Sequence, residues 1–67
     1  MEDLKNKTIG ERIRYLRGNQ TQKELAEAVH VSVSAIGMFE QDRRVPRDET
    51  KKEIADYFGL LVDDIFF

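Results

Sequence analysis

The fold is decided by residues 21–36, which read TQKELAEAVHVSVSAI. Their first four residues have the form Thr-x-x-Glu, a capping box whose two side chains satisfy free amides at the start of a helix. Apolar residues then recur at helical spacing, and we expect them to form one buried face. These residues are Leu25, Ala28 and Val29. The pattern predicts a short helix over residues 22–29.

A second helix is expected after a turn at His30 and Val31. Ser32 is a preferred N-cap residue, so this helix is predicted over residues 33–41. At about 100° per residue, its side chains divide between two faces. The expected core face carries Ser32, Ala35, Ile36 and Phe39, and the outward face carries Ser34, Gly37, Met38 and Gln41. Two short helices joined in this way, with the outer face of the second exposed, form a helix-turn-helix, whose second helix enters the major groove of DNA.

Three further helices complete the prediction. Their expected ranges are 9–17, 48–58 and 62–66. The first of them starts at a second capping box, from Thr8 to Glu11, and ends at Gly18, a natural helix stop. Core candidates recur along all three helices: Ile9, Ile13, Leu16, Ile54, Ala55, Phe58, Val62, Ile65 and Phe66. The fold class predicted is all-α, a compact five-helix bundle that forms a single domain over residues 1–67.

The composition argues against several classes of protein. The chain has no cysteine, which removes disulfides and thiolate metal sites. His30 is the sole histidine and has no obvious carboxylate cluster beside it, so neither a metal site nor a nucleophile–base pair can be built. We expect no enzyme, no metal, no cofactor and no small-molecule ligand. The apolar runs are too short to span a membrane, and the first residues lack the apolar core of a signal peptide. We therefore expect a cytoplasmic protein that binds no membrane.

The distribution of charge is more informative than its total. The formal net charge of the chain is −2. Residues 1–47 hold nine Lys and Arg against seven Asp and Glu, whereas residues 48–67 hold two against six. Because local charge decides where a polyanion docks, the first part of the chain is the better candidate for contact with nucleic acid.

Four stretches resemble the Cro/repressor-type helix-turn-helix domains, the XRE-like family. They are IGERIRYLR, TQKELAEAVHVSVSAI, FEQDRRVP and FGLLVDDIF, within residues 9–66. The most specific matches are Thr-Gln-x-x-Leu-Ala at the start of one helix and Val-Ser-x-x-x-Ile at the start of the next. The resemblance implies a lambda-repressor-like DNA-binding domain and a sequence-specific transcriptional regulator of bacterial or phage origin. It also implies that helix 33–41 docks in the major groove of a double-stranded DNA operator. We expect a repressor that blocks polymerase at its operator, and the alternative that stays open is an activator that recruits polymerase.

The resemblance implies roles for individual residues. Base contacts are expected from Val33, Ser34, Gly37 and Met38. A phosphate contact is expected from Gln22, and the basic segment after the second helix adds Arg43, Arg44 and Arg47, because a duplex backbone would pass there. No arginine stands on the outward face of helix 33–41, although apolar side chains can contact a thymine methyl group. The alternative is that Val33 and Met38 contact another protein.

Two further expectations concern structure and strain. Glu40 lies about 40° from Ile36 around the helix and is drawn toward the core, where a carboxylate needs a partner. The resemblance places Arg17 against it as a structural ion pair. The family usually has glycine at the positions of His30 and Asp42, and we expect a left-handed backbone at His30.

The last expectation concerns assembly. A single short recognition helix contacts too few base pairs to specify an operator, so we expect a homodimer on DNA. Phe67, with Leu60 or Leu61, would supply its contact. The alternative function is a protein-interaction module on the same fold, such as an antitoxin or antirepressor partner.

Overall fold

The computed structural model describes residues 4–67, and these form five α-helices and one short 3-10 helix, without a strand. Their bounds are η1 (Leu4–Asn6), α1 (Ile9–Arg17), α2 (Gln22–Ala28), α3 (Val33–Glu40), α4 (Asp48–Phe58) and α5 (Val62–Phe66). The prediction of five α-helices is confirmed, with α2 and α3 each ending one residue earlier than expected. No helix in this part of the chain is long and apolar enough to cross a membrane.

Local side-chain chemistry sets the starts of the first three α-helices. Thr8 and Glu11 form the predicted capping box of α1, in which the Thr8 amide donates to Glu11 Oε1 (2.8 Å) and the Glu11 amide to Thr8 Oγ1 (3.1 Å). Thr21 and Glu24 repeat this arrangement at α2, with distances of 2.8 and 3.0 Å. The hydroxyl of Ser32 accepts the Ala35 amide at the start of α3 (3.0 Å). These helices therefore begin where the sequence predicts.

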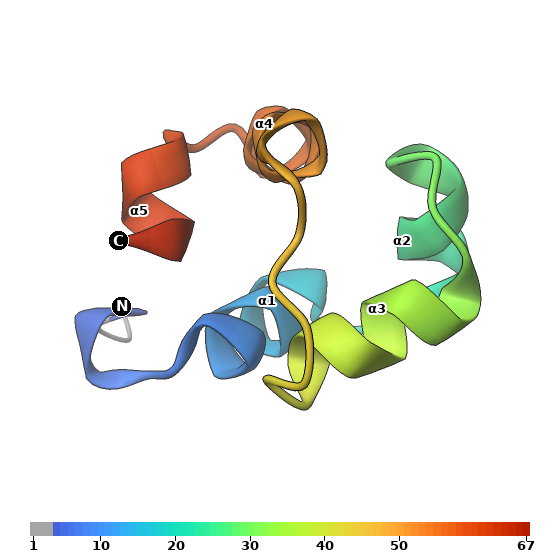
Figure 1. The fold of residues 1–67 in the computed structure, drawn as a ribbon, viewed down its shortest axis with the longest axis horizontal. Coiled ribbons are helices and arrows are strands. Elements are labelled where there is room, and N and C mark those ends of the chain that lie inside the picture. The colour runs from blue at the N-terminus through green and yellow to red at the C-terminus, as the bar shows by residue number, and fades with distance from the viewer. Residues whose placement is uncertain (1–3) are drawn as a thin grey trace.

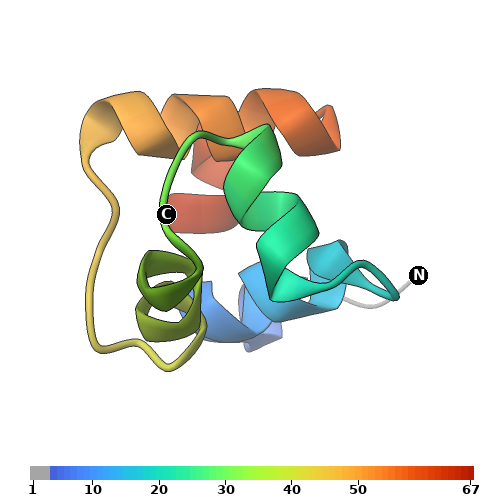
Figure 2. The same ribbon diagram turned by 90° about the vertical axis from the view of Figure 1, so that its right-hand side faces the viewer.

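The helices enclose one apolar core. α3 packs on α1 and α2, while α5 packs on α1 and α4 (Figure 1). Each α-helix contributes one large apolar residue with no exposed surface: Ile13, Leu25, Ile36, Ile54 and Ile65. A long connector, residues 41–47, runs along the outside of the molecule from the end of α3 to the start of α4 (Figure 2). The outward side of α3 is left uncovered by this arrangement.

Two core predictions are wrong. Ala28 is exposed, and Ala26 is buried in its place. By helical geometry, these two alanines lie about 80° to either side of the direction shared by Leu25 and Val29, so spacing alone does not distinguish them. Ser32 is also exposed, because it precedes α3 as the N-cap and its hydroxyl is used on the Ala35 amide.

α2, α3 and α4 end in the same way. Each of these helices is followed closely by a residue with a positive φ. The angle is 63° at His30 after α2, 59° at Asp42 after α3, and 70° at Gly59, the C-cap of α4. The next amide then bonds back five residues, as in a Schellman motif, with N···O distances of 2.9–3.0 Å. The left-handed backbone predicted at His30 is confirmed.

α1 approaches the end of α3 closely at Gly10. A Cβ placed on Gly10 would lie 2.6 Å from the backbone oxygen of Phe39 and closer still to that of Glu40. No side chain fits between the two backbones. The close approach brings the carboxylate of Asp42 to the start of α1, where it accepts the Thr8 hydroxyl (2.7 Å) and the Gly10 amide (2.8 Å).

Candidate nucleic-acid interface

The outward face of α3 exposes a mixed surface that is largely apolar. Val33, Ser34, Met38 and Gln41 are exposed, and Gly37 is half-buried. Val33 is 44% exposed and Met38 39%, while Ala35, Ile36 and Phe39 on the opposite face are buried. The four predicted base-contacting residues therefore lie together on one accessible surface. None of the side chains on this face carries a charge.

Gln22 borders this face on the side of α2. It lies in the first turn of α2, and its Nε2 donates to Glu40 Oε1 (3.0 Å). Its Oε1 lies over the bare backbone of Gly37, 3.9 Å from the position that a Cβ would take there. Glu40 thus holds the amide of Gln22 beside the outward face of α3. One hydrogen of that amide remains free to donate elsewhere.

Arg17 and Glu40 form an ion pair behind this edge. Arg17 Nε lies 2.7 Å from Glu40 Oε2, and Arg17 Nη2 donates to Oε1 (3.1 Å). The two side chains are 15% and 5% exposed. The hydrogen bond to Glu40 raises the pKa of Arg17 further, against the opposing effect of burial. Because Glu40 also holds Gln22, the pair links α1 to the edge of the proposed DNA-facing surface.

The three arginines of the connector lie on the other side of α3 and are not equivalent. All are exposed, and within residues 4–67 none of their side chains makes an ion pair or hydrogen bond. Arg43 directly follows the left-handed Asp42, and its amide donates to the Met38 oxygen (2.9 Å), which fixes its backbone against the end of α3. Arg44 and Arg47 instead line a hollow between α3 and α4.

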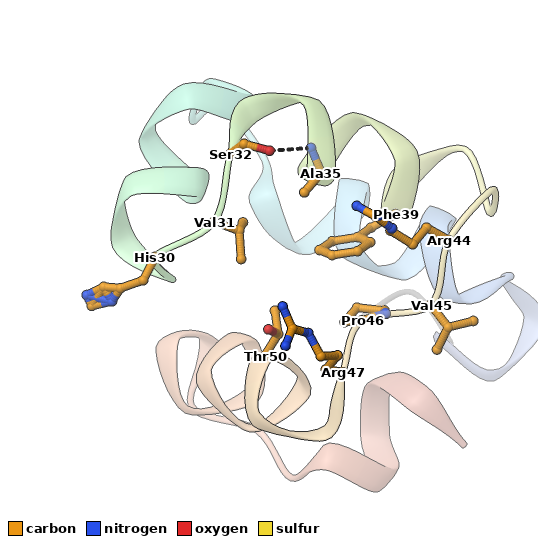
Figure 3. A pocket seen from close by; sticks show the side chains of 10 residues that line it. All are labelled: His30, Val31, Ser32, Ala35, Phe39, Arg44, Val45, Pro46, Arg47 and Thr50. Carbon is orange, nitrogen blue, oxygen red and sulfur yellow. Dashed lines mark hydrogen bonds between the residues drawn. The ribbon is translucent and has the colours of Figure 1, made fainter.

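This hollow has a volume of about 420 Å³. In Figure 3, the guanidinium of Arg44 lies beside the ring of Phe39, and that of Arg47 lies beside Thr50 at the start of α4. The rest of the lining combines apolar side chains, among them Val31 and Pro46, with the polar side chains of His30 and Ser32. The sequence grouped the three arginines as one basic segment, but in the structure the backbone of Arg43 is bonded to the end of α3, whereas Arg44 and Arg47 line the hollow along its flank.

The sequence reasoning missed two structural residues, Arg12 and Asp42. Arg12 is 8% exposed, and its guanidinium donates to four backbone carbonyls at distances of 2.7–3.1 Å. The acceptors belong to Leu4, Lys7, Ile65 and Phe67. Arg12 lies about 40° from Leu16 around α1, so its place on the apolar face was a signal of burial. Asp42 was noted only for replacing a glycine, whereas its carboxylate caps α1.

The acidic residues and the single histidine of the described part of the chain do not gather into a metal site. Within residues 4–67, no three side chains of His, Cys, Asp or Glu lie close enough together to hold a metal ion. His30, the sole histidine, is exposed beside the hollow that Arg47 lines.

Comparison with known proteins agrees with this geometry. A family model described as helix-turn-helix matches residues 13–65, a range that runs from within α1 to within α5. Among curated proteins, the HTH-type transcriptional activator BcrR of Enterococcus faecalis is 34% identical over 59 residues. That match covers 85% of this chain but only 29% of the activator's length. No solved structure matches the chain. With the family match spanning most of its length, and with α2, the turn at His30 and α3 arranged as described, this chain belongs to the helix-turn-helix family.

Proposed function

We propose that this domain binds an operator in double-stranded DNA by placing α3 in the major groove, and so regulates transcription. Its membership of the helix-turn-helix family and its similarity to a transcriptional activator support DNA-binding transcription regulation as the general role. The observation that carries the specific proposal is the uncovered face of α3, which has a polar border on one side and, on the other, exposed arginines that pair with nothing in residues 4–67.

These borders fit the geometry of a duplex. The major groove is about 12 Å wide and lies between two sugar–phosphate backbones, and it admits an α-helix. Gln22 lies beside Gly37 at one edge of α3, and the connector with its exposed arginines leaves the end of the helix on the other side (Figure 2). A helix seated in the groove would bring Gln22 to one backbone and this basic segment to the other.

The roles of individual residues follow from this placement. Val33, Ser34, Gly37 and Met38 face the base edges, and Gln22, Arg43, Arg44 and Arg47 face phosphates. Gln22 can use its second amide hydrogen on a phosphate while Glu40 holds the first. Arg17 and Glu40 position Gln22 and do not themselves contact DNA.

We further propose that the described residues act as a repressor. A domain bound across a promoter occupies DNA that polymerase needs, and no further surface is required for that effect. The curated relative is named an activator, and the match covers 29% of it. A reporter with the operator overlapping the promoter, compared with one that has the operator upstream, separates the two actions. For a repressor, expression should fall only when the operator overlaps the promoter. Increased expression from the reporter with the upstream operator contradicts repression.

We propose that the domain binds its operator as a two-fold dimer. Related domains contact two half-sites about 34 Å apart on one face of the duplex. Leu61 and Phe67 are 72% and 70% exposed, so apolar surface remains around α5 for a second copy. Sedimentation with a palindromic operator is expected to show two chains per duplex, and Phe67→Ser should weaken the assembly. One chain per operator at saturation contradicts the dimer.

The central experiment selects binding sites from random duplexes and then measures affinity against salt. If Arg43 neutralises one phosphate, Arg43→Ala should weaken all duplexes about equally and flatten the slope of log K against log[salt] by about 0.9. Lys52→Ala is the matched control, because it also removes one exposed cation but lies on α4, across the molecule from α3 (Figure 2). A protein that enriches no duplex, or an unchanged slope for Arg43→Ala, contradicts the proposal.

A further inference from the structure

We infer that the outward face of α3 recognises C5-methyl groups in the major groove, those of thymine above all, and not the edges of guanine. This inference rests on the proposed function, since it names the chemistry by which the same face selects its DNA. On this face, exposed apolar side chains lie beside a bare stretch of helix backbone, and none of its side chains is a cation.

Two large apolar side chains on the outward face of α3 are exposed. Val33 and Met38 expose 44% and 39% of their surface in a helix whose other large apolar residues, Ile36 and Phe39, are almost completely buried. In the major groove, thymine alone among the four standard bases presents a methyl group, and apolar side chains are the groups that contact it. Val33 carries two methyl groups on a stiff side chain, and Met38 ends in a flexible thioether that adapts to an irregular surface.

Gly37 leaves the helix backbone bare in the middle of this face. A glycine inside a helix is destabilising relative to alanine, so its presence needs a reason. At Gly10 the reason lies within the fold, because a Cβ would collide with backbone atoms of α3. At Gly37 a Cβ would meet, among residues 4–67, only Gln22 Oε1, at an ordinary contact distance of 3.9 Å. Nothing in this part of the fold requires a glycine there, so we assign the space beside Gly37, one helical turn beyond Val33 and next to Met38, to a ligand outside the protein.

The outward face of α3 carries no arginine or lysine that could pair with guanine. Arginine or lysine paired with guanine O6 and N7 is the commonest specific contact in the major groove, and residues 32–42 contain neither. Ser34 hydrogen-bonds to any base and discriminates little. Gln22 uses one of its two amide hydrogens on Glu40. Gln41 is the exposed side chain of this face that can pair specifically with a base edge, that of adenine. The partner of adenine is thymine, whose methyl group can fit against Val33, Met38 and the backbone of Gly37.

The test removes methyl groups from the DNA and leaves its hydrogen-bonding groups unchanged. Each thymine of a selected operator is replaced in turn by deoxyuridine, and affinity is measured with the full chain. We expect a loss of about fourfold at each thymine that faces α3, which is the factor expected for burying one methyl group. At the same positions, replacing T·A by C·G should lower affinity, and 5-methylcytosine should recover part of that loss.

Protein variants assign the effect to these side chains. Val33→Ala should abolish the loss of affinity caused by deoxyuridine at the thymine that Val33 contacts, and Met38→Ala should do the same at its own thymine. Each pair of changes, one in the protein and one in the DNA, forms a double-mutant cycle that measures the coupling between the side chain and the methyl group. Val45→Ala is the matched control, because it removes a 63% exposed apolar side chain from the connector and should leave the sensitivity unchanged. Gly37→Ala should fold at least as stably as the parent and bind the thymine operator more weakly.

The outcomes separate this inference from the proposed function. A chain that binds no duplex contradicts both. A chain that binds a selected duplex tightly, with a salt slope, but tolerates deoxyuridine at every position refutes methyl recognition and leaves operator binding intact. Strong dependence on a guanine, revealed by 7-deazaguanine substitution opposite α3, also refutes it. Val33→Ala and Met38→Ala variants that bind the operator normally would assign the exposed apolar surface to another protein.

Discussion

Substitution by glycine at His30 and at Asp42, which both have a left-handed backbone conformation, should change the free energy of unfolding in opposite directions. His30 and Asp42 have φ angles of 63° and 59°, a conformation that costs an L-residue about 1–2 kcal/mol. Glycine removes this cost at either position. The His30 side chain makes no hydrogen bond or ion pair with residues 4–67, so nothing is lost with it. After the greater freedom of glycine in the unfolded chain is subtracted, His30→Gly should stabilise the domain by about 0.5–1 kcal/mol.

The same substitution at Asp42 removes two hydrogen bonds. The Asp42 carboxylate accepts the Thr8 hydroxyl at 2.7 Å and the Gly10 amide at 2.8 Å. The Thr8 hydroxyl is exposed and can turn to water, whereas the Gly10 amide is partly buried at the start of α1. A hydrogen bond to a charged group contributes about 1.5–3 kcal/mol. Set against the relief of backbone strain, Asp42→Gly should destabilise the domain by about 1–2 kcal/mol.

Urea denaturation followed by circular dichroism measures both changes at equal protein concentration. The signs can be compared directly, because both variants gain the same glycine freedom in the unfolded state. Asp42→Asn serves as a third variant, since it keeps an acceptor for the Gly10 amide and should lose less than Asp42→Gly. If Asp42→Gly is as stabilising as His30→Gly, the bonds from its carboxylate contribute nothing and the reasoning is refuted. If His30→Gly is destabilising, the backbone strain is refuted.

The remaining predictions concern buried polar groups and the close contact of α1 with α3. Glu40→Ala should destabilise by about 3–5 kcal/mol because it leaves Arg17 largely buried without its partner, and a loss below 1 kcal/mol in urea denaturation would contradict this. Gly10→Ala should lower stability by about 3 kcal/mol, since its Cβ would collide with backbone oxygens of α3, and a thermal midpoint equal to the parent's would contradict the packing. Arg12→Met should cost about 2–3 kcal/mol by leaving buried carbonyls without a donor, and amide exchange should show α5 losing protection first.

The predicted helices were recoverable because their signals are local. The capping boxes at Thr8 and Thr21 and the N-cap at Ser32 act between residues three apart, so the printed order of residues already contains them. The same holds for the left-handed backbone at His30, which ends a helix within its own turn. The outward face of α3 also followed from spacing, because side chains on one helix keep fixed angles to each other.

The arrangement around the proposed interface was only partly recoverable. The angle of Glu40 around α3 predicted that its side chain turns toward the core, but the choice of Arg17 as its ion-pair partner came from family resemblance. The hydrogen bond from Gln22 to Glu40 appears only in the folded chain. The arginines of the connector look alike in sequence. Their division between the end of α3 and the hollow beside α4 depends on the path of residues 41–47 across the surface.

The sequence by itself determined where the helices begin, which face of each is apolar, and which face of α3 is left exposed, because these properties depend on residues within one or two helical turns. Tertiary structure alone decided that Ala26 and not Ala28 is buried, since both lie at equal angles from the core direction of α2. It also decided the roles of Arg12 and Asp42, whose hydrogen bonds reach partners up to 55 and 34 residues away. No local pattern encodes such pairs, because they form only when the close packing of α1 against α3 and α5 brings distant backbone groups within reach.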